Sequence, residues 1–190
     1  MLRKSTALTA VALAFALTAP IATVRAQTPP APASFKAEII RSIEDAEKKL
    51  VALAERFPEE KYSWHPEGAR STSEAFMHIA AGNYTYSTFI GTPRPEGTTG
   101  AALAKITDKP KVIETLKASF AHIKAAIQNA PDLDKAIKLF GRDATVREAM
   151  IVAATHCHEH LGQLIAYARV NGIVPPWNEE HAPPAHPAKN

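Results

Sequence analysis

Residues 145–170 read TVREAMIVAATHCHEHLGQLIAYARV, and this stretch decides the fold class. Apolar side chains recur in it every three or four residues, which is the period of an amphipathic α-helix. Thr145 and Glu148 have the spacing of a capping box, which predicts that the helix begins there. Gly172 and Pro175 follow the stretch and predict its end. The pattern therefore indicates one helix of about seven turns.

Three further helical patterns precede this one, and a proline lies within three residues of the end of each. They span Phe35 to Phe57, Ser71 to Ile90 and Lys109 to Asn129, and the second also opens with a capping box. No segment alternates with a strand period over a useful length. Four amphipathic helices without strands predict an all-α fold, a four-helix bundle over residues 35–173.

The connections predict the topology of this bundle. About 13 residues join the first two helices, whereas about 18 residues, from Gly91 to Asp108, join the second to the third. A connection of that length can cross the bundle from end to end. The second and third helices are therefore expected to run parallel, with a long crossover between them.

The first 26 residues have the pattern of a secretory signal peptide. Arg3 and Lys4 form a basic start, residues 7–19 are mainly apolar, and Val24-Arg25-Ala26 fits a cleavage site. The apolar run is too short to predict a membrane span. We therefore expect a periplasmic or secreted protein with no stable membrane association after cleavage.

Proline-rich segments flank the predicted bundle, and composition limits the partners. Residues 27–34 are expected to be a flexible linker, and residues 174–190 a proline-rich tail. Three basic residues leave with the signal peptide and all 19 acidic residues stay, so the net charge falls from +3 to zero. Such a chain offers no electrostatic basis for binding nucleic acid. Its single cysteine, Cys157, excludes an internal disulfide and is expected to be an inert core residue.

Three of the eight histidines are the candidate metal ligands. His156 and His160 lie four residues apart on the inward face of the last helix, whereas His158 points towards solvent. Two buried imidazoles need polar partners, and a hydrogen-bonded pair would suffice. With a third histidine, a divalent metal becomes the more economical explanation. His78, on the second helix, is that third candidate.

A length argument supports His78. At 1.5 Å per residue, His78 lies roughly 18 Å from the end of its helix at Ile90. His156 and His160 lie roughly 20 Å from the start of theirs at Thr145. If the two helices are antiparallel neighbours, the three rings meet at one level.

The remaining histidines receive no role. His65, His181 and His186 fall in predicted loops or the tail, and His122 is expected to be a partly exposed filler on the third helix. The segment His158-Glu159-His160 lacks the His-Glu-x-x-His spacing of zinc proteases, which excludes that class.

Several stretches in order resemble one known family: YSWHP at 62–66, STSEAFMHIA at 71–80, TVREA at 145–149, residues 156–163, and NGIVPP at 171–176. Over about residues 35–177 the chain resembles the DinB family of four-helix-bundle metalloproteins. The resemblance implies a crossover connection and a divalent metal, zinc or nickel, held by His78, His156 and His160. It also points to a homodimer and to thiol-dependent transferases or isomerases. This chain differs in its signal peptide, and low-molecular-weight thiols are scarce outside the cytoplasm, which argues against thiol transfer.

A metal on three imidazoles would keep an open position and act as a Lewis acid. Glu159 and Gln163 are candidates to orient a ligand by hydrogen bonds from outside the coordination sphere. Tyr84 and Tyr86 are either donors to a developing anion or aromatic residues of the core. We therefore expect a metal-dependent hydrolase or group transferase acting on an unknown small molecule. The alternative is a non-catalytic exported bundle that binds a metal or a ligand.

Overall fold

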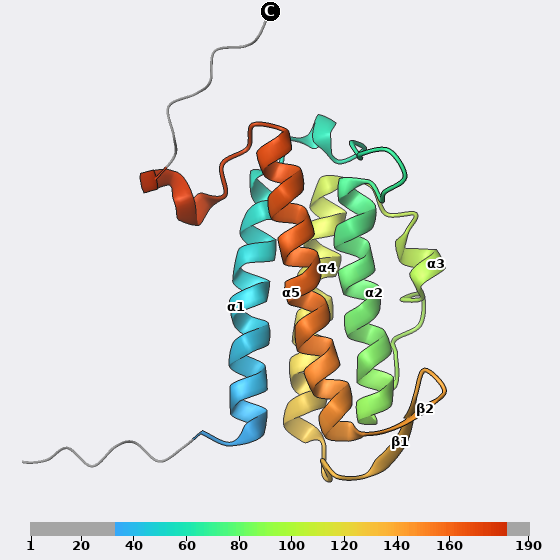
Figure 1. Ribbon diagram of the computed structural model, residues 1–190. Helices are drawn as coiled ribbons and strands as arrows, with labels where there is room; N and C mark the ends of the chain where they lie inside the picture. Colours follow the sequence, from blue (N-terminus) through green and yellow to red (C-terminus); the bar gives the residue numbers. More distant parts are fainter. Residues whose placement is uncertain (1–32, 182–190) are drawn as a thin grey trace, which may run out of the picture. The chain divides into compact units, whose positions relative to one another are not determined.

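The computed structural model describes residues 33–181, and this part of the chain is mainly helical (Figure 1). Its long helices are α1 (Phe35–Arg56), α2 (Thr72–Ile90), α4 (Lys109–Asn129) and α5 (Val146–Val170). Shorter elements are η1 (Glu59–Lys61), α3 (Gly100–Leu103) and η2 (Pro176–His181). The prediction of a mainly helical fold is confirmed. Each long helix begins and ends within about one residue of the positions predicted from the sequence. Among the described residues, no helix is both long and apolar enough to span a bilayer.

The predicted signal peptide at 1–26, almost all of the predicted linker at 27–34 and the last nine residues of the tail lie outside the described residues. Export therefore stays a prediction.

Hydrogen bonds between helix ends give the direction of each helix. The Lys36 ammonium, at the start of α1, donates to the carbonyls of Gln128 and Ala130 at the end of α4. The Lys109 ammonium, at the start of α4, donates to the carbonyls of Glu55 and Phe57 at the end of α1. The helices α1 and α4 are therefore antiparallel, and each lysine satisfies carbonyls that have no partner within the helix.

The other pairings follow from the packing. Both α2 and α1 pack against α4 and α5, and the four lie side by side in Figure 1. The hydroxyl of Tyr167, near the end of α5, donates to the carbonyl of Arg70 just before α2, so α2 and α5 are antiparallel. The Arg147 guanidinium, at the start of α5, lies over the Phe35 ring at the start of α1, so α1 and α5 run parallel. The helices α2 and α4 are each antiparallel to one of these two and therefore run parallel to each other. The connection between them, which contains α3, returns along the outside of α2 (Figure 1).

Local side-chain chemistry fixes the helix starts that the sequence predicted. Ser71 and Glu74 form a complete capping box, in which each side chain accepts a hydrogen bond from the other's backbone N–H. At α5 only half of the expected box forms. The Thr145 hydroxyl accepts from the Glu148 N–H, but the Glu148 carboxylate pairs with the Arg142 guanidinium rather than with the backbone of Thr145.

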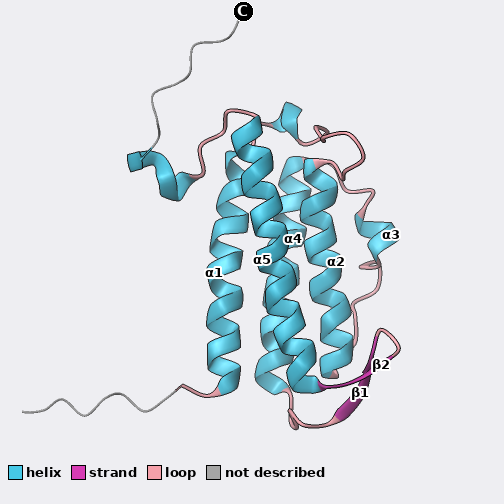
Figure 2. Cartoon of the chain, viewed as in Figure 1, coloured by secondary structure: helices cyan, strands magenta, loops and turns pink. Residues whose placement is uncertain are grey.

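The expectation that no strands occur was wrong. A short hairpin, β1 (Ala136–Leu139) and β2 (Arg142–Thr145), lies between α4 and α5, coloured magenta in Figure 2. Phe140 and Gly141 form its two-residue turn and both have positive φ, 49° and 89°. Strands of four residues are too short to show alternation, and the turn lacks the usual Asn-Gly or Asp-Gly signal because phenylalanine occupies its first position.

A buried polar cluster crosses the otherwise apolar core. The Asn83 amide, fully buried on α2, donates to the Ser119 hydroxyl of α4 at 3.1 Å. The Cys157 thiol of α5 donates to the Asn83 carbonyl oxygen at 3.4 Å, and the Ser119 hydroxyl donates to the Leu116 carbonyl. A buried amide needs such partners, so this cluster fixes the relative register of three helices.

We predict that Asn83→Ala lowers the free energy of unfolding by about 2 kcal/mol, because it removes two buried hydrogen bonds and leaves a void. Urea denaturation would measure the change. Thr88→Ala, on the exposed side of the same helix, is the control and should cost less than about 0.5 kcal/mol. Equal losses in the two variants would show that the buried cluster contributes nothing specific.

Candidate metal centre

The structure brings together the three histidines that the sequence singled out. One ring nitrogen each from His78, His156 and His160 can be chosen so that all lie within 4.8 Å of one another. The His156 ring centroid is 5.0 Å from that of His78 and 4.6 Å from that of His160. The rings come from α2 and α5, which pack together, and they meet at one level as the helical rise predicted.

The separations fit one metal ion better than a hydrogen-bonded pair. The Nε2 atoms of His78 and His156 lie 3.3 Å apart, longer than the usual N–H hydrogen bond. Two nitrogens at zinc bond lengths of about 2.0–2.1 Å in tetrahedral geometry are separated by about 3.4 Å. The three residues therefore fit a divalent ion.

A glycine on α2 makes this geometry possible. Gly82 lies one turn after His78, and a Cβ built on it would lie 2.4 Å from Cε1 and 2.8 Å from Nδ1 of His156. Real Cβ atoms essentially never come that close, so the imidazole occupies the space of the missing side chain. The sequence alone did not predict this role for Gly82.

Burial keeps two of the rings neutral, as metal ligands must be. Desolvation, followed by the charge of Arg70, lowers the pKa of His78 to about 4. Desolvation lowers the pKa of His156 to about 3, with smaller contributions from its two neighbouring histidines. The lone pairs of both rings are therefore free at neutral pH.

A chain of hydrogen bonds orients the third ring. The His160 Nδ1 lies 2.8 Å from the Gln163 carbonyl oxygen, so Nδ1 carries the proton and Nε2 offers the lone pair. The Gln163 amide donates to the Tyr167 hydroxyl, which donates to the Arg70 carbonyl. Gln163 was predicted from the sequence to orient a ligand, whereas the role of Tyr167, one turn further on the same helix face, was not predicted.

The other candidate residues contribute less to the site than the three histidines and Gln163. Glu159 is exposed and acts on His78 and Tyr86 only through its charge. The Tyr86 ring lies 5.4 Å from that of His156, whereas Tyr84 packs against His122, away from the site. Only Tyr86 of the two tyrosines is therefore placed to meet a ligand.

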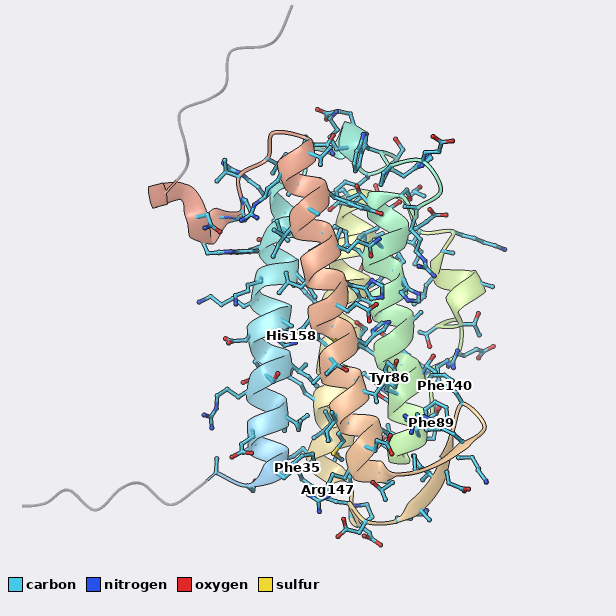
Figure 3. All side chains as sticks on the ribbon, in the orientation of Figure 1. Phe35, Tyr86, Phe89, Phe140, Arg147 and His158 are labelled. Carbon is cyan, nitrogen blue, oxygen red and sulfur yellow. The ribbon has the colours of Figure 1, made fainter. Side chains whose placement is uncertain are left out.

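The remaining residues singled out in the sequence lie outside the site. His158 is exposed, as expected, and in Figure 3 it lies between α1 and α5. His65 is exposed and His122 is half-buried. Burial raises the pKa of the Cys157 thiol to about 12, so the cysteine is an unreactive core residue at neutral pH.

Two hollows open beside His78 and make the site accessible. One, of about 310 Å³, lies towards Arg70 and Glu74. The other, of about 250 Å³, also contains His156 and is bordered by Tyr86 and by Phe140 of the hairpin. Gly100 of α3 borders both hollows, so the connections between the helices shape the approach to the histidines.

We predict that Gly82→Ala weakens zinc binding by about tenfold or more, because the new methyl group displaces the His156 ring. A competition titration against a chromogenic chelator would measure the affinity. Gly162→Ala is the matched control, since a Cβ at this helical glycine meets nothing within 4 Å. The control should keep its affinity and gain roughly 0.5–1 kcal/mol of stability. Unchanged zinc affinity in Gly82→Ala would refute the proposed role of this glycine.

The metal-free protein should lose stability in mild acid. The folded pKa values of about 4 for His78 and about 3 for His156 lie below the ordinary 6.5, so the unfolded chain binds more protons between these limits. The free energy of unfolding should therefore fall as the pH drops below about 6.5. Urea titrations from about pH 7 to about pH 5 would measure this slope. His156→Gln should show a shallower one, and identical slopes would contradict the assignment.

Comparisons with known proteins identify the family and support the fold. The DinB superfamily model matches residues 42–164, which include all three histidines. A crystal structure of a DinB-like protein from Bacillus subtilis superimposes with a TM-score of 0.58 at 24% identity, covering 72% of this chain and 93% of that one, and supports the fold. No curated protein matches the sequence. Since the family model covers well over half of the chain, this protein belongs to the DinB superfamily.

Proposed function

We propose that this protein is an exported DinB-superfamily member that holds one divalent metal ion and uses it as a hydrolase or group transferase. The observation that carries the proposal is the convergence of His78, His156 and His160 beside two open hollows. A centre built only for stability needs no such access. The export part of the proposal is supported by the signal-peptide pattern of the sequence.

The three histidines would supply the protein ligands. Zinc or nickel, once bound, would provide a Lewis acid that lowers the pKa of a coordinated water or thiol towards neutrality. Both metals accept imidazole nitrogen, and the lack of an anionic ligand would leave the ion its full positive charge.

The chain's own groups would prepare the ligand for reaction. Gln163 fixes the His160 ring through its hydrogen bond to Nδ1, and Tyr167 in turn holds Gln163. Burial raises the pKa of Tyr86, so this residue stays a neutral phenol that can donate a hydrogen bond to a developing anion.

We also propose that the four long helices form the four-helix bundle with a crossover that the family resemblance implies. The support is the packing of α1 and α2 against both α4 and α5, together with the parallel course of α2 and α4.

Metal analysis of the purified protein tests the central claim. The wild type should contain about one equivalent of zinc or nickel, and the double variant His156→Ala/His160→Ala should contain none. His158→Ala is the matched control, because this histidine lies on the same helix but faces solvent. Absence of metal in the wild type, even after incubation with both ions, would refute the proposal.

A further inference from the structure

We propose that Phe140, at the tip of the hairpin, makes the hollow beside His78 and His156 a binding site for the aromatic ring of a ligand. The inference rests on the proposed function, since the ligand's donor group would sit at the metal. It goes beyond that function by assigning a chemical class to the rest of the ligand.

The hollow has the size and chemistry for a ring. Its volume is about 250 Å³, and a cavity of about 150 Å³ is enough to hold benzene. Apart from the two histidines, its lining consists of Ala81, Gly82, Thr85, Tyr86, Gly100 and Phe140. None of these lining residues carries a charge at neutral pH. The Thr85 hydroxyl already donates to the Ala81 carbonyl and accepts from Arg94, which leaves the wall largely apolar.

Phe140 occupies its position at a double cost to stability. Its φ of 49° lies in the left-handed region, which bulky residues rarely adopt and which costs about 1 kcal/mol or more. Its side chain is also 65% exposed, although it is large and apolar. Glycine, asparagine or aspartate would suit the first position of this turn better. Edge-on contacts with Tyr86 and Phe89 offset part of this cost, and a ligand that covers the exposed face of the ring would offset more of it.

The neighbouring aromatics connect Phe140 to the metal ligands. The Phe140 ring meets Tyr86 edge-on at 5.9 Å and Phe89 at 5.0 Å, and these three residues gather beside the hairpin in Figure 3. On its other side, Tyr86 lies 5.4 Å from the His156 ring. A ligand bound through a donor atom at the histidines thus has an aromatic wall along which its own ring can pack.

Two hydroxamic acids test this arrangement, because they share a metal-binding group and differ in the ring. Calorimetry with the zinc-loaded protein would compare benzohydroxamic acid with acetohydroxamic acid. The wild type should prefer the aromatic compound, and Phe140→Gly should lower that preference about fivefold without changing the affinity for acetohydroxamic acid. Phe140→Tyr, the conservative variant, should retain the preference.

Two further readouts distinguish a ligand-binding role of Phe140 from a structural one. The melting temperature of Phe140→Gly should change little, because relief of the positive φ offsets the loss of the ring contacts with Tyr86 and Phe89; a fall of several degrees would indicate a structural role. Metal content, measured in parallel, reports on the proposed function alone. If the chain takes up no metal, benzyl alcohol should still shift the amide NMR signals of Gly82, Gly100 and Phe140. The proposal is overturned if the wild type shows no aromatic preference, if Phe140→Gly keeps it, or if a metal-free chain shows no such shifts.

Discussion

The approach of α5 to the bare backbone of α2 at Gly82 is the constraint on which the site depends. The His156 imidazole occupies the volume of a missing Cβ, and this directs its Nε2 towards His78, one turn earlier on α2. The adjacent residues on both helices, Asn83 and Cys157, join through a hydrogen bond and fix the register of the same contact. A glycine thus permits the approach and an asparagine sets the alignment. A slip of one residue along either helix would turn a histidine out of the cluster.

The helices and the ligand set could be predicted from the sequence because their signals are local. Ser71 and Glu74 mark a helix start within four residues, and the four-residue spacing of His156 and His160 places them on one face in any α-helix. His78 required one further step, a comparison of lengths along two helices. That step succeeded because the rise of a helix is fixed by its hydrogen bonds.

The features that escaped prediction depend on contacts between distant segments. Gly82 resembles any other helical glycine until α5 is placed against it, and the role of Tyr167 requires the carbonyl of Arg70, 97 residues away. The hairpin escaped because strands of four residues leave too few positions to distinguish a period. Its turn adopts a conformation that the identity of Phe140 argues against.

The single cysteine and the wide separation of the ligands together have a consequence for the stability of the folded chain. His78 and His156 are 78 positions apart, and the chain has no second thiol with which to form a disulfide. An ion held by both helices would act as a reversible cross-link between two segments that lie far apart in the sequence. The concentration of free metal would then set the stability of the contact between α5 and α2. An ion that binds only the folded state stabilises that state in proportion to the logarithm of the ion concentration. In a protein without disulfides, the availability of metal would therefore control how stably these two helices are joined.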